Sequence, residues 1–155
     1  MPTVVTFGEA MIRLAPPEFK RLEQTNSLTM TVGGAELNVA VGLARLGVAS
    51  AWVSRLPDNA LGRFCANKAR ELGVDTANIV WSPSDRMGLY FVEFGAAPRP
   101  SSVLYDRAGS AVSKVEPGMV DWNIVLKGAK WFHTSGITPA LSDSCAQTVA
   151  EALQA

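Results

Sequence analysis

The sequence predicts a single α/β domain with parallel strands at its core. Short β-branched runs alternate with helix-like segments, the order of elements typical of proteins with a parallel sheet. The length of 155 residues corresponds to one domain or to part of a larger one. Hydrophobic residues make up 48% of the chain, which is enough for a packed core and argues against disorder.

The beginning of the chain is predicted to form three strands with no helix between them. Val4–Phe7 is a β-branched run closed by a glycine, and Met11–Ala15 is stopped by two prolines. Leu28–Val32 is stopped by Gly33 and Gly34. Together with strands in the middle of the chain, this arrangement predicts an additional antiparallel layer beside the parallel core.

The next two helices have clear start and stop residues. Ala35–Leu46 is followed by Gly47, a residue type that commonly ends helices. Because this segment contains few polar residues, we expect its helix to be buried on nearly all sides. After a strand over Ala49–Ser54, the turn Pro57–Asn59 can cap a helix over Ala60–Leu72.

The second half of the chain alternates short strands with two more helices. The predicted strands are Ile79–Trp81, Met87–Phe94, Val103–Asp106 and Lys130–Thr134, of which the second and third pair. The predicted helices are Trp122–Lys127, with Asp121 near its start, and a last helix that Ser142 can cap, with Ala146, Val149 and Leu153 on one face. The chain ends inside this last pattern without a stop residue, so we expect it to be cut short of its domain.

Charge and cysteine content exclude several classes of protein. Lys plus Arg and Asp plus Glu both number 14, and a net charge of zero argues against a nucleic-acid partner. Cys65 and Cys145 lie 80 positions apart beside a single histidine, which excludes a Cys/His zinc site and disfavours a disulfide scaffold. No leader peptide and no apolar run of about 18 residues is present. We expect a cytoplasmic protein with no membrane partner.

Gly33 and Gly34 come directly after a strand and open a helix. Glycines allow a close approach to the backbone, and the free N–H groups of a helix start favour an anion or hydroxyl groups. No Gly-Lys-Ser/Thr follows, so the segment is not a phosphate-binding Walker A loop. Asn38, one turn into the helix, either belongs to an internal hydrogen-bond network or is a ligand for hydroxyl groups.

Tyr90, Tyr105 and Arg107 form a second group on the predicted strand pair. A phenol can bind hydroxyl groups, and a guanidinium can hold a carboxylate in a fork, so the group suits a sugar acid. The alternative is ordinary surface residues on a hairpin, with Arg107 paired to Asp106 or solvated. His133 lies in an apolar strand without recognisable Ser or Cys partners, so nucleophilic catalysis has no support.

A longer motif contains the two glycines and the asparagine. Thr31–Gly47 reads TVGGAELNVAVGLARLG and resembles the N-terminal motif of the ribokinase-like sugar kinases, the PfkB family. Further segments resemble the 2-keto-3-deoxygluconate kinases of that family. These segments are Gly8–Pro17, Leu56–Gly62, Gly88–Phe91, Tyr105–Ala111 and Trp131–Leu141. The Leu-Pro-Asp of the second segment, where many relatives have Gly-Asp, also resembles this subgroup.

The resemblance implies a ribokinase-like fold, a three-layer α/β/α sandwich with a small β-sheet lid. Residues 1–155 would be the N-terminal, substrate-binding part, with lid strands within about 11–32 and 87–107. The C-terminal nucleotide-binding part, with the catalytic Asp base, would lie beyond Ala155. The resemblance therefore implies no catalytic, nucleotide-binding or metal-binding residue in this segment, and the segment alone is expected to be inactive.

The implied reaction is transfer of the γ-phosphoryl group of ATP, with Mg²⁺, to the 6-hydroxyl of 2-keto-3-deoxy-D-gluconate. By resemblance, Gly34 and Asn38 bind sugar hydroxyls, and Tyr90, Tyr105 and Arg107 on the lid hold the oxygens of the sugar acid. Family members often pair through their lids, so a homo-oligomer is expected. Two alternatives stay open: a kinase of another small sugar such as fructose or ribose, and a non-catalytic binding or assembly module.

Overall fold

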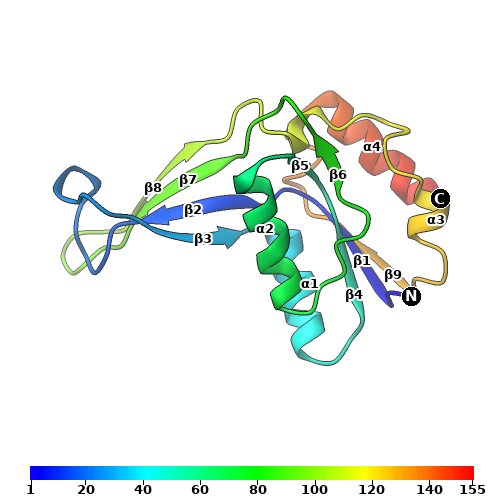
Figure 1. The fold of residues 1–155 in the computed structure, drawn as a ribbon, viewed down its shortest axis with the longest axis horizontal. Coiled ribbons are helices and arrows are strands. Elements are labelled where there is room, and N and C mark those ends of the chain that lie inside the picture. The colour runs from blue at the N-terminus through cyan, green and yellow to red at the C-terminus, as the bar shows by residue number, and fades with distance from the viewer.

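A computed structural model describes all residues from 1 to 155 as a three-layer body from which a separate sheet projects (Figure 1). The strands are β1 (Val4–Phe7), β2 (Met11–Ala15), β3 (Thr29–Gly33), β4 (Ser50–Val53), β5 (Arg55–Pro57), β6 (Val80–Ser82), β7 (Leu89–Glu93), β8 (Ser102–Asp106) and β9 (Trp131–His133). The helices are α1 (Ala35–Arg45), α2 (Ala60–Glu71), α3 (Trp122–Val125) and α4 (Asp143–Gln154). Short 3₁₀ helices cover Leu22–Gln24 and Val112–Lys114. No helix is long and apolar enough to cross a membrane.

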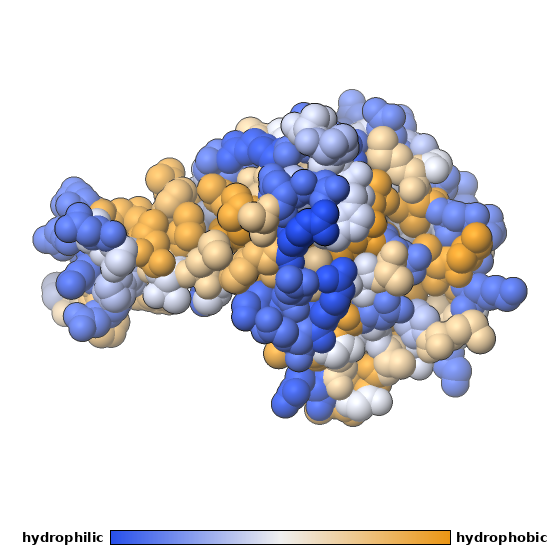
Figure 2. Space-filling model, in the orientation of Figure 1, coloured by the Kyte–Doolittle hydropathy of each residue, from blue (hydrophilic) through white to orange (hydrophobic).

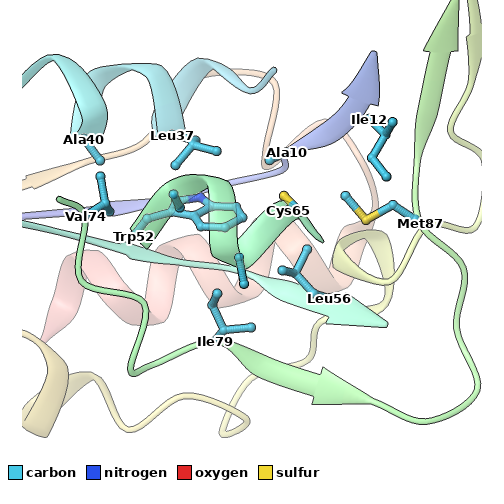
Figure 3. Packing of buried hydrophobic residues seen from close by; sticks show 12 residues of the cluster. Ala10, Ile12, Leu37, Ala40, Trp52, Leu56, Cys65, Val74, Ile79 and Met87 are labelled. Atoms are coloured by element: carbon cyan, nitrogen blue, oxygen red, sulfur yellow. The ribbon is translucent and has the colours of Figure 1, made fainter. Parts of the chain in front are cut away.

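The body is built on a parallel sheet in the order β4-β1-β9, as the alternation of elements predicted. Its side chains alternate between two apolar clusters, one on each face. Trp52 of β4 lies in the cluster with α1 and α2, shown in Figure 3, and its ring nitrogen donates to the Gly8 carbonyl at 3.1 Å. Ala51 and Val53 of the same strand lie in the opposite cluster with α3 and α4. The body is therefore an α/β/α sandwich.

The projecting sheet has the strand order β3-β2-β7-β8. Two of its pairings are antiparallel, and the central pairing of β2 with β7 is parallel, so the expected antiparallel layer is in fact mixed. One face carries apolar residues that begin in the core and continue outward along the sheet, where Leu104 is 60% exposed. Figure 2 shows this hydrophobic surface between the body and the polar tip.

Two helices are buried differently from the sequence prediction. The helix over 35–46 was expected to be covered on nearly all sides, but α1 buries only Glu36, Leu37 and Ala40, and Leu46 is 81% exposed. The prediction was wrong because α1 packs on β1 and β4 through one face only. In α4 the face predicted from Ala146, Val149 and Leu153 is also not the face that is buried. The buried residues are Cys145, Thr148, Val149 and Ala152.

The reason for the shifted face of α4 lies in its polar contacts. Thr148 can be buried because its hydroxyl donates to the Ser144 carbonyl at 2.8 Å. The Cys145 thiol donates to the Val112 carbonyl at 3.2 Å, which fixes this side of the helix toward the body. The more apolar Leu153 is left 68% exposed. Hydrophobicity alone therefore did not identify the buried face.

The smaller differences concern strand ends. The third strand continues through Gly33, which pairs with Met11, although a stop was expected at Val32. Arg55–Pro57 forms the unpredicted β5, parallel to β6. The predicted caps of α2 and α4 are confirmed, because the side chains of Asn59 and Ser142 accept hydrogen bonds at the starts of these helices. The Asp121 side chain does the same at the start of α3.

Candidate functional site

The predicted site residues lie around the junction where the projecting sheet joins the body. The chain crosses this junction four times: between β1 and β2, β3 and α1, β6 and β7, and after β8. The first crossing, Gly8–Ala10, follows the carboxyl end of the central strand β1. Ligands of α/β proteins commonly bind beyond the carboxyl ends of parallel strands.

Gly33 and Gly34 are both required by packing within the chain. A Cβ at Gly34 would overlap the Glu9 carbonyl oxygen and lie 3.0 Å from the Ala10 Cβ. A Cβ at Gly33 would overlap the Tyr90 hydroxyl. Gly34 has an extended φ of −172°, which any residue can adopt, so close approach and not backbone conformation explains it. The two glycines thus leave room for the Tyr90 side chain, which reaches Gly33 from β7 across β2, and for the first crossing.

Tyr90 and Tyr105 form a cross-strand pair on one face of the projecting sheet. They lie opposite each other in the β7–β8 register, with ring centroids 5.9 Å apart and an interplanar angle of 26°. Tyr105 is 58% exposed, whereas Tyr90 is partly buried beneath it. The same face carries Arg13, whose Nε donates to the Thr31 hydroxyl at 2.9 Å.

Arg107 is the first residue after β8 and extends toward the body. Its guanidinium carbon lies 5.8 Å from the centre of the Tyr105 ring, and its Nη2 is ion-paired with the Glu9 carboxylate. The suggested pairing with Asp106 is wrong. Asp106 instead accepts two hydrogen bonds from Arg86, at 2.7 and 2.6 Å, which lower the pKa of its carboxyl. Arg107 also lines a hollow of about 560 Å³ together with Ile137.

Asn38 lies apart from the other four residues. Its side chain is exposed and makes no hydrogen bond, so the suggested internal network is not formed. It lines a separate hollow of about 380 Å³ between β3, α1 and α2, together with Thr31 and Lys68. The structure therefore connects these four residues through a series of contacts: Gly34 and Arg107 with Glu9, Arg107 with Tyr105, and Tyr105 with Tyr90. Asn38 is left at the neighbouring surface.

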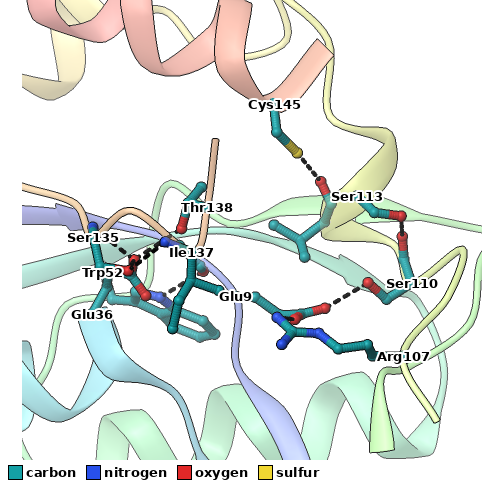
Figure 4. Close-up of polar contacts among 12 residues, drawn as sticks. Glu9, Glu36, Trp52, Arg107, Ser110, Ser113, Ser135, Ile137, Thr138 and Cys145 are labelled. Carbon is teal, nitrogen blue, oxygen red and sulfur yellow. Dashed lines mark hydrogen bonds and ion pairs between the residues drawn. The ribbon is translucent and has the colours of Figure 1, made fainter. Parts of the chain in front are cut away.

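Two buried carboxylates were not singled out from the sequence. Glu9 accepts a hydrogen bond from the Ser110 hydroxyl at 2.5 Å in addition to the Arg107 ion pair (Figure 4). Glu36 accepts from the backbone N–H and hydroxyl of Ser135 at 2.9 and 2.6 Å, and from the Thr138 hydroxyl at 2.9 Å. One feature of the sequence could have identified both: each is a charged residue within an otherwise apolar segment. A charge that is buried in such a segment needs a partner.

A third carboxylate anchors the segment that follows Arg107. Asp85 accepts hydrogen bonds from Lys114 at 2.7 Å and Ser82 at 2.5 Å, and is ion-paired with Arg55 at 2.5 Å. The Lys114 and Ser82 contacts and the charge of Arg55 lower the pKa of Asp85 to about 2. Arg55 also donates to the Ala111 carbonyl at 2.8 Å. These contacts hold the last crossing against the body.

The two other residues considered from the sequence are Cys65 and His133. Burial raises the pKa of the Cys65 thiol to about 12, and Cys65 packs within the core of Figure 3. His133 ends β9 and is half-buried, with no hydrogen bond from its ring. No group of three or more His, Cys, Asp or Glu side chains is placed to hold a metal ion.

Comparison with known proteins gives consistent matches along the whole chain. The pattern of the pfkB family carbohydrate kinases matches residues 1–155. A 2-dehydro-3-deoxygalactonokinase of Haloferax volcanii is 48% identical over 97% of this chain and 47% of its own length. The crystal structure of a 2-dehydro-3-deoxygluconokinase from Thermotoga maritima is 47% identical, with a TM-score of 0.96 over 99% of this chain and 47% of that one.

A more distant relative has been solved as a complex with ATP. The sugar kinase from Pyrococcus horikoshii in complex with ATP is 27% identical, with a TM-score of 0.85 over 97% of this chain and 48% of that one. The chain thus spans about half the length of the proteins it matches. The fold prediction, a ribokinase-like sandwich present as its N-terminal part, is confirmed by these structures.

Proposed function

Because the chain belongs to the pfkB family of carbohydrate kinases, we propose that the protein transfers the γ-phosphoryl group of ATP to the 6-hydroxyl of 2-keto-3-deoxy-D-gluconate. The observation that carries this proposal is the grouping of Tyr90, Tyr105 and Arg107 at Gly33–Gly34. Two phenols and a guanidinium provide donors for hydroxyl, keto and carboxylate oxygens. The names of relatives 47–48% identical to the chain support a sugar-acid substrate.

In this proposal the chain contributes substrate positioning. Phosphoryl transfer depends on in-line placement of the acceptor and neutralisation of charge, with little covalent chemistry for the protein to perform. Gly34 and Asn38 would bind sugar hydroxyls, and the projecting sheet would act as a lid that brings Tyr90, Tyr105 and Arg107 over the sugar. Closure of such a lid would keep water from the γ-phosphate.

ATP and Mg²⁺ are part of the proposal through the family. The ATP complex of the Pyrococcus horikoshii kinase supports the nucleotide. As the family resemblance implies, we assign none of the 155 residues to the nucleotide, the metal or the catalytic base. When bound, Mg²⁺ would neutralise negative charge on the phosphates.

We also propose that two copies associate through the projecting sheet. Leu104 and Met30 lie on its apolar face and are 60% and 39% exposed. Exposed apolar surface of this kind commonly marks an interface. Gel filtration of the full-length protein tests this proposal. We expect the wild-type protein to elute as a dimer and the Leu104→Lys variant to elute as a monomer. A monomeric wild-type protein would contradict the proposal.

The substrate is tested by turnover of the full-length protein with ATP and Mg²⁺. The sugar acids 2-keto-3-deoxygluconate and 2-keto-3-deoxygalactonate are compared with fructose and ribose, and the phosphorylated carbon is identified by NMR. The galactonate is a second candidate because the Haloferax volcanii relative carries that name. A preference for fructose or ribose would overturn the sugar-acid assignment. Absence of any turnover would favour the binding-module hypothesis.

A further inference from the structure

The four crossings between the body and the projecting sheet all lie close to one residue, Glu9. Glu9 itself lies on the first crossing. The second crossing touches its backbone at Gly34, and a Cβ at Gly88 on the third would lie 3.2 Å from its Oε1. The fourth crossing supplies Arg107 and Ser110. Glu9 thus lies close to every connection that determines the direction of the sheet, and its carboxylate is bonded to the fourth.

Glu9 is the only hydrogen-bond partner of the Arg107 side chain. The bond uses Nη2, while Nη1 has no partner and Nε is buried without one. The other contact that orients the guanidinium is with the Tyr105 ring. The Glu9 side chain is 3% exposed and that of Arg107 is 28% exposed, so water competes little at the carboxylate and more at the free nitrogen.

From these contacts we infer that Glu9 is a positioning residue for the substrate: its buried carboxylate orients Arg107 so that Nη1 is presented to an oxygen of the sugar acid. This inference rests on the proposed function. It also changes how Arg107 is used. Because Nη2 already donates to Glu9, Nη1 is the terminal guanidinium nitrogen without a protein partner, and we assign the contact with the substrate to it.

Ser110 holds Glu9 from the other side. Its hydroxyl donates to Glu9 Oε1 at 2.5 Å, and its carbonyl accepts from the Ser113 hydroxyl at 2.7 Å (Figure 4). Arg107 and Ser110 engage different carboxylate oxygens, Oε2 and Oε1. The carboxylate is therefore fixed in rotation, which is the property required of a group that orients another side chain.

The test compares Glu9→Gln, Arg107→Met and the double variant in the full-length protein. Glu9→Gln keeps the shape of the side chain but removes the charge that holds Arg107. We expect it to raise the KM for 2-keto-3-deoxygluconate about tenfold while changing the KM for ATP less than about twofold. In the Arg107→Met background, Glu9→Gln is expected to have no further effect on the sugar KM, because Glu9 acts through Arg107.

Two further variants serve as checks. Ser110→Ala removes the second donor with little loss of volume, and we expect a smaller increase in the sugar KM than for Glu9→Gln. Asp58→Asn removes a carboxylate that is also ion-paired with an arginine, Arg63, at the start of α2, and is expected to leave the sugar KM unchanged. A Glu9→Gln protein with a lower melting temperature and unchanged sugar KM would overturn the inference, because Glu9 would then be only structural.

The melting temperatures of the same variants separate this inference from the proposed function. If the wild-type protein phosphorylates no sugar acid, the proposed function fails. The changes in melting temperature then show whether Glu9 and Arg107 interact. Non-additive changes for Glu9→Gln and Arg107→Met support the pairing that the inference requires, and additive changes overturn the inference.

Discussion

The hydroxyl group of Tyr90 occupies the space that a side chain at Gly33 would fill, so the two residues fit together only while residue 33 has no Cβ. This relationship joins β3 to β7 across β2, on the face of the sheet where Tyr105 stacks on Tyr90. It links the glycine motif to the aromatic pair, which are far apart in the sequence.

Gly33→Ala is expected to displace the Tyr90 ring and disturb its stacking with Tyr105. In the full-length protein we expect the KM for the sugar acid to rise about tenfold, as is typical for loss of a good positioning contact. Gly42→Ala is the matched control. A Cβ at Gly42 meets no atom within 4 Å in the interior of α1, so this change should stabilise the protein by about 0.5–1 kcal/mol without altering KM. Equal KM values for both variants would contradict the role of the contact.

Arg107→Ala is expected to weaken use of the sugar acid far more than use of ATP. Loss of a charged donor to the substrate should cost about 1.5–3 kcal/mol, measured as kcat/KM for the sugar acid. The melting temperature should also fall, since Glu9 would stay buried with Ser110 as its remaining partner. Arg63→Ala, which removes an exposed ion pair with Asp58, is the control. An unchanged kcat/KM for the sugar acid would exclude Arg107 from the site.

Asn38→Ala is expected to lower sugar affinity without lowering stability. The Asn38 side chain is exposed and makes no hydrogen bond, and alanine is the better helix former, so the melting temperature should stay the same or rise slightly. Binding of the sugar acid is measured by calorimetry. Gln147→Ala on the exposed side of α4 controls for the helix effect. If affinity is unchanged, Asn38 is a surface residue without a role in binding.

Asp85 is expected to make folding stability depend on acidic pH. Its pKa is lowered from 3.8 to about 2 in the folded chain, chiefly by Lys114. The stabilisation is therefore fully present above about pH 4 and is lost as the pH falls toward about 2, because the unfolded chain binds the proton first. Urea unfolding across this range measures the loss. Asp85→Asn should flatten the dependence and lower stability at pH 7, whereas Glu116→Gln, an exposed carboxylate, should do neither.

The 155-residue chain expressed alone is expected to be inactive and to self-associate. Its edge strands β3, β8 and β9 are open, and Ile124, Trp131 and Leu153 are 67–68% exposed. Open edges and exposed apolar side chains favour association between chains. Thermal unfolding and gel filtration measure this directly. A sharp two-state transition at a monomeric elution volume would contradict the expectation.

The sequence by itself determined the local elements and the family. The strands Val4–Phe7 and Met11–Ala15 were predicted with their observed ends, and so were the capping side chains of Asn59 and Ser142. These features depend on neighbouring residues: β-branched runs, glycine and proline stops, and side chains that reach an N–H two or three positions away. The family motif is likewise a continuous stretch, so it can be read without the fold.

Only the tertiary structure decided which faces are buried and which charges meet. Glu9 and Arg107 are separated by 98 positions and Glu36 and Thr138 by 102, and nothing in the local sequence pairs them. The exposed side of α1 was also misjudged from its composition, because hydropathy reports what a face can bury and not what packs against it. Long-range pairing depends on where the crossings bring the chain together, and that position is set by the packing of the whole fold.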